Sequence, residues 1–144
     1  MIILASDHAG YVLKEKIKKI LTFMQVKFLD IGTSSLDLTD DYPDYAIKAG
    51  KVVLENEENK GIFICGTGIG MSITANKIKG IRATTVNSKK MVELAVKHNH
   101  VNVITLSGRF LPNFKIKGIL HAFLNSEFEG GRHERRIEKI TALE

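Results

Sequence analysis

The sequence predicts an α/β fold in which helices cover both faces of a five-stranded parallel sheet. Two observations lead to this prediction. Short apolar runs alternate with amphipathic helical patterns from one end of the chain to the other. The apolar runs also lack a regular polar face, which is typical of strands buried on both sides. Such alternation forms a parallel sheet, and right-handed crossovers then give a doubly wound, Rossmann-like arrangement.

The individual elements follow from the same patterns. Strands are expected at five apolar runs, residues 1–6, 26–32, 61–65, 81–86 and 102–106. Helices are expected at residues 12–24, 45–57, 70–78, 88–98, 112–124 and 133–144. The first helix is the clearest, because apolar residues recur at helical spacing at Val12, Leu13, Ile17, Ile20 and Leu21. Pro112 opens the fifth helix, and a polar loop closed by Pro43 precedes the second.

Length and composition indicate one globular domain over residues 1–144, large enough to bury a core without disulfides. The hydrophobic share of 44% and the charged share of 26% are ordinary for such a domain. No apolar run approaches the roughly 20 residues of a membrane-spanning helix. The N-terminus meets Asp7 too early for a signal peptide. The single cysteine cannot form an internal disulfide, so we expect a cytoplasmic protein that does not associate with membranes.

The net charge of +5 raises the question of nucleic-acid binding, since basic surfaces attract phosphate. The lysines do not support that interpretation, because several belong to one amphipathic helix and most others are scattered. Zinc-finger spacing and an RNA-binding aromatic signature are also absent. We therefore expect solvated lysines, no nucleic-acid partner, and a few arginines that hold a small phosphorylated ligand.

The carboxyl ends of the expected strands are where a doubly wound fold binds its ligand. This rule selects four segments, namely Ser6–His8, the loop that begins at Cys65, Asn87–Ser88 and Gly108–Arg109. The loop in GIFICGTGIGMSITANK is the most distinctive, because Gly66, Gly68 and Gly70 alternate with other residues. Glycine adopts positive φ without a Cβ clash, so such a loop can curl its amides around an anion at a helix N-terminus.

Two familiar phosphate-binding motifs do not match this loop. The phosphate loop of NTPases requires Lys and Ser/Thr directly after its last glycine, whereas Met71 and Ser72 follow Gly70 here. The dinucleotide fingerprint requires a third glycine where this chain has Met71. The sequence therefore predicts an anion-binding loop of another kind.

Cys65 stands where the third strand ends and this loop begins. Backbone amides and a helix N-terminus stabilise a thiolate, and a thiol that ionises near neutral pH suits a base that abstracts protons. Free cysteines are more often small buried core residues. The residues alone leave both interpretations open.

Five motifs occur in order along the chain: ASDHAG, DYPDYA, CGTGIGMSITANK, HNHVNV and GGRHERR. Together they closely resemble the type B ribose-5-phosphate isomerases of the ribose/galactose isomerase family, from Met1 to Ile140. The resemblance implies an aldose–ketose isomerase that interconverts D-ribose 5-phosphate and D-ribulose 5-phosphate, in the pentose phosphate pathway, through a cis-enediolate. It implies no cofactor, and the histidines show no cysteine-paired spacing that would indicate a metal site.

The resemblance also implies catalytic roles. Cys65 would take the proton from C2 and return it to C1, while Thr67 assists with its hydroxyl. The amides of the loop from Gly66 to Gly70, with Gly68 and Ile69 between them, would hold the enediolate as an oxyanion hole does. Opening of the sugar ring would fall to His98 or to the pair Asp7 and His8, and the sequence does not decide between them.

The remaining matches concern substrate binding. Tyr42 would line the pocket, and Asn99 is a further matching position. The phosphate would be bound by Arg109, Arg132 and Arg136, because the planar guanidinium suits phosphate oxygens. In the family the C-terminal helix reaches a neighbouring subunit, so the resemblance implies a homodimer or a dimer of dimers with shared active sites.

Two alternatives stay open at this point. One is an isomerase of a six-carbon sugar phosphate, such as allose 6-phosphate or galactose 6-phosphate. The other is a sugar-phosphate-binding module without catalytic activity. His100 and Val101 depart from the residues that many relatives carry, as does the Ser107–Gly108 pair before Arg109. These positions belong to the pocket rim in the family and bear on sugar length or epimer preference.

Overall fold

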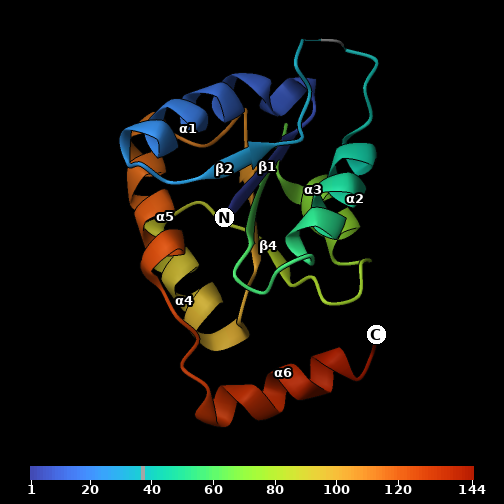
Figure 1. Ribbon diagram of the computed structural model, residues 1–144, viewed down its shortest axis with the longest axis vertical. Helices are drawn as coiled ribbons and strands as arrows, with labels where there is room; N and C mark the ends of the chain where they lie inside the picture. The colour runs from blue at the N-terminus through green and yellow to red at the C-terminus, as the bar shows by residue number, and fades with distance from the viewer. Residues whose placement is uncertain (37) are drawn as a thin grey trace.

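The computed structural model describes residues 1–36 and 38–144. Its sheet contains five strands, β1 (Ile2–Ser6), β2 (Phe28–Asp30), β3 (Lys60–Cys65), β4 (Ala83–Thr85) and β5 (Val103–Ser107). The spatial order is β2-β1-β3-β5-β4, and each neighbouring pair is parallel (Figure 1). The predicted five-stranded, doubly wound parallel sheet is therefore confirmed.

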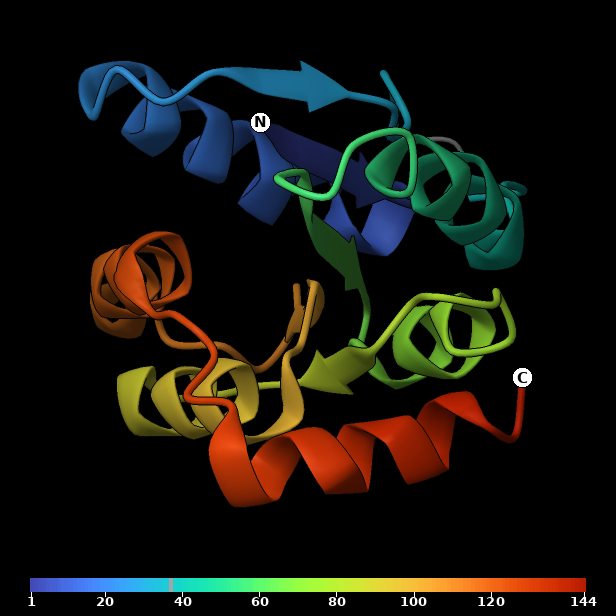
Figure 2. The same ribbon diagram turned by 60° about the horizontal axis from the view of Figure 1, so that its bottom comes forward.

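Helices cover both faces of this sheet. They are α1 (Tyr11–Phe23), α2 (Tyr42–Val53), α3 (Ile69–Ala75), α4 (Lys89–Asn99), α5 (Asn113–Asn125) and α6 (Glu134–Thr141). Two short 3-10 helices, η1 (His8–Gly10) and η2 (Gly131–His133), precede α1 and α6. Figure 2 shows α1, α4 and α5 on one face of the sheet, and α2 and α3 on the other. Among the described residues, every helix is too short or too polar to cross a membrane.

Alternate residues of β1, β3 and β5 enter two separate cores, because successive side chains of a strand point to opposite faces. Toward α1, α4 and α5 the strands bury Leu4, Ile62, Ile64, Ile104 and Leu106. Toward α2 and α3 they bury Ile3, Ala5, Phe63, Cys65 and Val103. Each fully buried large apolar side chain contributes about 1.5–3 kcal/mol. The two cores together hold the strands, and hence their carboxyl ends, in fixed positions.

The second helix begins earlier than the sequence predicts. We expect a polar loop up to Pro43 and a helix over 45–57, whereas α2 starts at Tyr42 and ends at Val53. Asp41 is its N-cap residue and Pro43 lies in its first turn. Proline is tolerated there, because the first N–H groups of a helix have no intrahelical partner. The helical start places the Tyr42 side chain beside the end of β3. Residue 37 of the predicted loop lies outside the described residues.

The chain reverses its direction of winding between β1 and β3. From β1 it proceeds outward to β2 at one edge, and from β3 it builds the other half of the sheet. In open α/β sheets a crevice forms at this switch point, beyond the carboxyl ends of the two strands. Ser6 and Ile64 are paired in register there, so Asp7 and Cys65 emerge side by side.

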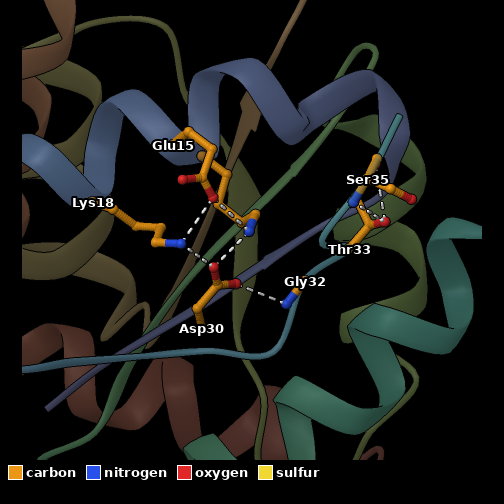
Figure 3. A network of polar contacts seen from close by, with 7 residues as sticks. Glu15, Lys18, Asp30, Gly32, Thr33 and Ser35 are labelled. Carbon is orange, nitrogen blue, oxygen red and sulfur yellow. Dashed lines mark hydrogen bonds and ion pairs between the residues drawn. The ribbon is translucent and has the colours of Figure 1, made fainter. Parts of the chain in front are cut away.

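A buried lysine joins α1 to the edge strand β2. Lys14 is 1% exposed, and its ammonium donates to Asp30 at 2.5 Å and to Glu15 at 3.1 Å. Lys18 lies 2.8 Å from the same two carboxylates, and the Gly32 N–H donates to Asp30 at 3.0 Å (Figure 3). Burial alone would raise the pKa of Asp30, but the hydrogen bonds from the two lysines and from Gly32 outweigh it and hold that pKa below its usual value.

We expect Asp30→Asn to lower the free energy of unfolding by about 2 kcal/mol at neutral pH, because Lys14 stays buried without its nearest anion. The folded pKa of Asp30 is depressed, so its contribution is present above the ordinary Asp pKa near ~4 and is lost as the pH falls through the lower folded value. Urea unfolding at several pH values between about 7 and 3 measures the difference from the unsubstituted chain. A difference that does not shrink toward low pH would contradict this account.

Candidate active site

A cleft of about 460 Å³ opens at the switch point of the sheet. Segments that are far apart in the chain form its walls: the turn after β1, the start of α2, the loop between β3 and α3, and the turn after β5. Nine of the residues that the sequence analysis selected line it, namely Asp7, His8, Tyr42, Cys65, Gly66, Thr67, Ile69, Gly70 and Arg109. The first part of the predicted site is therefore assembled within one chain.

Cys65 lies at the boundary between the core and the cleft, a position compatible with both interpretations that the sequence left open. It is 4% exposed and packs in the core beneath α2 and α3, yet it also lines the cleft. Its sulfur accepts a hydrogen bond from the N–H of Gly68 at 3.2 Å. Gly68 has a φ of +82°, which glycine adopts without strain, and it is buried behind the cleft wall. The loop is thus bent so that an amide points at the sulfur.

Thr67 shapes the same turn. Its hydroxyl accepts a hydrogen bond from the N–H of Ile69, the first residue of α3, at 3.2 Å. The side chains of both residues are exposed at the cleft. The hydroxyl of Thr67 therefore lies at the surface of the cleft, near the helix N-terminus that follows the loop.

Arg109 brings a positive charge to this loop. The turn after β5 is held against it by three hydrogen bonds, Gly108 N–H to the Cys65 carbonyl (2.9 Å), Arg109 N–H to the Gly66 carbonyl (3.2 Å) and the Ser107 hydroxyl to the Gly66 carbonyl (2.8 Å). A Cβ on Gly66 would lie 3.2 Å from the Cζ atom of Arg109. The guanidinium therefore rests directly on the loop that carries the cysteine.

Asp7 and His8 enter the cleft from the end of β1. Asp7 is 5% exposed, and its carboxylate accepts the Gly10 N–H at 3.0 Å as the N-cap of η1. Burial raises the pKa of Asp7, and the hydrogen bond from Gly10 only partly opposes it. His8 lies beside Asp40, which the sequence analysis did not select, with 2.5 Å between Nδ1 and Oδ1. No sequence motif marks that contact, because the two residues are 32 positions apart.

Tyr42 forms the wall opposite the turn after β5. A Cβ on Gly70 would lie 2.6 Å from the Cζ atom of Tyr42, so the aromatic ring packs directly on the first turn of α3. Tyr42 as a whole is nevertheless 39% exposed. Gly70 therefore provides the space that the ring needs beside the cleft, in addition to its place in the loop.

Five predicted residues do not line this cleft. Gly68 lies behind its wall, and His98, Asn99, Arg132 and Arg136 lie elsewhere. His98 lies at the end of α4, and its ring stacks on that of His133 with centroids 4.3 Å apart. Asn99 lines a different cavity, between β4 and α6. Arg132 in η2 and Arg136 in α6 are exposed next to this stack, outside both helical layers (Figures 1 and 2). The chain thus divides the predicted site into two groups.

The stacked histidines and a nearby carboxylate form a group that cysteine-paired spacing in the sequence does not reveal. Ligand atoms of His98, Glu129 and His133 all lie within 4.8 Å of one another. However, a metal ion lies in the plane of each imidazole that binds it, and these two rings are parallel within 6°. One ring would have to turn before both bound the same ion. The group as it stands is a stacked pair with a carboxylate 3.8 Å from His98 Nε2.

Comparison with known proteins identifies the family. A sequence model described as Ribose/Galactose Isomerase matches residues 2–140. The chain belongs to the ribose/galactose isomerase family. Its similarity to individual members extends over nearly the full length of both chains. It is 42% identical over 138 residues to ribose-5-phosphate isomerase B of Escherichia coli (strain K12), covering 96% of this chain and 92% of that protein.

Solved structures agree with this assignment. The fold matches a ribose 5-phosphate isomerase from Thermotoga maritima with a TM-score of 0.94 and 46% identity, covering 98% of this chain and 97% of that one. It also matches ribose-5-phosphate isomerase B from Mycoplasma genitalium with bound ribulose-5-phosphate, with a TM-score of 0.93 and 43% identity, covering 99% and 94% of the two chains. The α/β fold predicted from the alternation of strands and helices is therefore confirmed.

The contact between Tyr42 and Gly70 makes a testable prediction for this ribose/galactose isomerase. Gly70→Ala should destabilise the protein by about 1 kcal/mol, because the new methyl group displaces the aromatic ring. Removing that ring with Tyr42→Ala should relieve the penalty, so that the two substitutions are strongly non-additive. Urea unfolding of the two single variants and the double variant measures this coupling.

Gly118→Ala is the matched control. Gly118 lies within α5, and a Cβ there would meet Lys89 Cβ only at 3.7 Å. Alanine should therefore be neutral or stabilising by up to about 1 kcal/mol, as expected for a helix interior without a clash. Equal effects of the two glycine substitutions would show that Tyr42 does not constrain Gly70.

Proposed function

We propose that this chain is an aldose–ketose isomerase that interconverts D-ribose 5-phosphate and D-ribulose 5-phosphate. The observation that carries the proposal is the cleft that Cys65 and Arg109 both line, with the amide of Gly68 donating to the sulfur from behind the cleft wall. A base, an amide-lined loop and a cation for phosphate are what this reaction requires. The relative from Mycoplasma genitalium, which binds ribulose-5-phosphate, supports the choice of substrate.

The proposed reaction moves a proton between two carbons of an opened sugar. The Cys65 thiolate takes the proton from C2 of the aldose, and the electrons shift to give an enediolate. The protonated sulfur then returns the proton to C1. The proton of the C2 hydroxyl moves to the oxygen on C1, which leaves a ketone at C2 and a hydroxyl at C1. Because hydrogen moves as a proton within one molecule, the reaction needs no redox cofactor.

The loop that follows Cys65 contributes to two of these steps. A hydrogen bond from an amide is stronger to an ionised acceptor, so the Gly68 N–H favours the sulfur when it is charged. The amides from Gly66 to Gly70, including that of Ile69, together with the hydroxyl of Thr67 would hold the enediolate oxygens. Removing one such donor from an oxyanion site typically costs about 100- to 1,000-fold in rate.

A second copy of the chain completes the site in this proposal. Two pairs of exposed apolar residues, here called stripes, lie beside the two groups of site residues. Ile69 and Ile73, both more than half exposed, lie one turn apart on α3 at the cleft. Met91 and Leu94 are exposed on α4 and share one helix face with His98, because the spacing is three and four residues. Pairing one stripe with the other in a homodimer, or in a dimer of dimers, would bring the groups together.

The second copy would supply the residues that the cleft lacks. Arg132 and Arg136 would join Arg109 around the phosphate, and Asn99 would reach the sugar. We assign ring opening to His98 rather than to Asp7 and His8. Both of the latter are hydrogen-bonded within their own chain, whereas the His98 ring stacks on His133 and lies 3.8 Å from Glu129, beyond hydrogen-bond distance. Asp7 and His8 would then bind sugar oxygens. A cytoplasmic location belongs to the same proposal, since the catalytic thiol has to stay reduced.

The function is tested by initial rates with ribose 5-phosphate, allose 6-phosphate and galactose 6-phosphate. We expect the pentose phosphate to be the preferred substrate. Cys65→Ala should lower kcat by at least about 100-fold, because the base is lost, and should leave substrate binding within a few-fold. In D2O the unsubstituted enzyme should incorporate deuterium during turnover.

Four results would contradict parts of this proposal. Turnover of Cys65→Ala at the original rate would remove the sulfur from the mechanism. Complete transfer of hydrogen without solvent exchange would favour a hydride shift. A hexose phosphate as the best substrate would keep the chemistry and overturn the pentose assignment. Absence of activity with all three sugars, together with tight binding of one, would indicate a binding module.

Sharing of sites between subunits is tested by mixing inactive variants. In mixed dimers of Cys65→Ala and Arg136→Ala, one of the two sites receives both intact residues. At random pairing about half of the dimers are mixed, so activity should return to about a quarter of the unsubstituted level. Native mass spectrometry verifies that the subunits have exchanged.

The control mixture is Cys65→Ala with Arg109→Ala. Both residues line the same cleft of one chain, so no mixed dimer contains an intact site and activity should stay low. Equal recovery in the two mixtures, or no recovery in either despite exchange, would contradict completion of the site by a second subunit.

A further inference from the structure

Asp40 contacts His8 at two points, from a loop that reaches across the end of β1. The Oδ1 atom accepts the backbone N–H of His8 at 3.1 Å and lies 2.5 Å from its ring Nδ1. Because an ionised carboxylate only accepts hydrogen bonds, Nδ1 has to be the donor in the second contact. The backbone contact places the carboxylate, and the ring contact then orients the imidazole.

This contact is largely removed from water. The Asp40 side chain is 11% exposed and that of His8 is 23% exposed. The second oxygen, Oδ2, is buried and has no hydrogen-bond partner among the residues that the structure describes. A buried carboxylate with one unpaired oxygen is costly for stability alone. This cost is offset if the paired oxygen, Oδ1, contributes to the function of the site.

The arrangement determines which atom of His8 meets a ligand. His8 lines the cleft, and Nδ1 is occupied by Asp40. Nε2 is therefore the ring nitrogen left for the cleft, whether or not the imidazole is protonated. As a neutral ring, His8 would accept from a sugar hydroxyl through Nε2, and as a cation it would donate to a phosphate or hydroxyl oxygen.

We propose that Asp40 is a positioning residue of the isomerase, which holds the Nδ1–H of His8 so that Nε2 binds an oxygen of the sugar phosphate. The proposal rests on the function proposed above. Asp40 itself does not touch the substrate. It acts through the histidine, in the way that carboxylates behind metal-bound histidines fix the tautomer and orientation of the ring.

Asp40→Ala should lower kcat/KM by about 10- to 100-fold, the usual range for loss of a carboxylate behind a functional histidine. Asp40→Asn should lose less, because its amide oxygen can still accept from Nδ1–H. Asp44→Asn is the matched control, since it removes the same charge from an exposed residue in the first turn of α2. Its kcat/KM should stay within about 2-fold, as for most surface substitutions.

A double-variant cycle with His8→Ala separates positioning from a structural role. If Asp40 acts only through the ring, Asp40→Ala should add less than about 3-fold to the loss caused by His8→Ala. If the two losses multiply, Asp40 acts independently of His8 and the proposal is overturned. Should Asp40→Ala fail to fold by circular dichroism, the same cycle with Asp40→Asn decides between these outcomes.

A readout without turnover keeps this inference separate from the proposed function. In ¹⁵N-labelled protein, His8 should show a protonated Nδ1, and Asp40→Ala should lose that signature while Asp44→Asn retains it. Persistence of the Nδ1–H form in Asp40→Ala would overturn the proposal even if the enzyme is an isomerase. Loss of the signature in a protein that isomerises no sugar would leave the positioning role intact and count against the function.

Discussion

The parallel pairing of β1 with β3 is the constraint on which the rest of the molecule depends. The chain changes its winding direction between these two strands, so no helix crosses over their carboxyl ends. Both strands are buried on both faces, and this burial fixes the positions of their last residues, Ser6 and Cys65. The loop after β3 is hydrogen-bonded to the turn after β5, and that turn packs on the turn after β1, since a Cβ on Gly108 would clash with the Ala9 carbonyl oxygen. A rigid frame therefore presents a small number of polar groups at one crevice.

Cys65 shows how core and site share one residue. It is the last residue of β3 and packs in the core beneath α2 and α3, and it also lines the cleft. A thiol suits this boundary because it packs like a small hydrophobe and still accepts a hydrogen bond from a backbone amide. The neighbouring Gly66 and Gly70 leave room for larger side chains, the guanidinium of Arg109 and the ring of Tyr42. The small residues of the loop thus allow these two larger side chains to pack directly on the loop that carries the sulfur.

Local sequence patterns predicted most of the fold. Most of the cleft residues were found because strand ends converge in a parallel sheet, whereas Tyr42 came from the family resemblance. The start of α2 was missed since Pro43 is compatible both with a loop and with a first helical turn. Asp40 was missed for a different reason. Its proposed role depends on its contact with His8, and the sequence around either residue does not indicate that contact. The grouping of His98 with His133 likewise arises from the approach of η2 to α4, which no spacing rule describes.

The separation of the site residues into two groups follows from the topology. His98 ends a helix on the far half of the sheet, and the two C-terminal arginines follow a segment that leaves both helical layers. Of the three arginines predicted to bind phosphate, only Arg109 lines the cleft at the ends of β1 and β3. Asp7 adds a buried acidic group at the same crevice, and the partly buried Asp40 lies behind His8. Both carboxylates repel a dianionic ligand. One guanidinium beside two carboxylates is a poor phosphate site, so cations from a second chain would be needed to make the crevice attractive to a sugar phosphate.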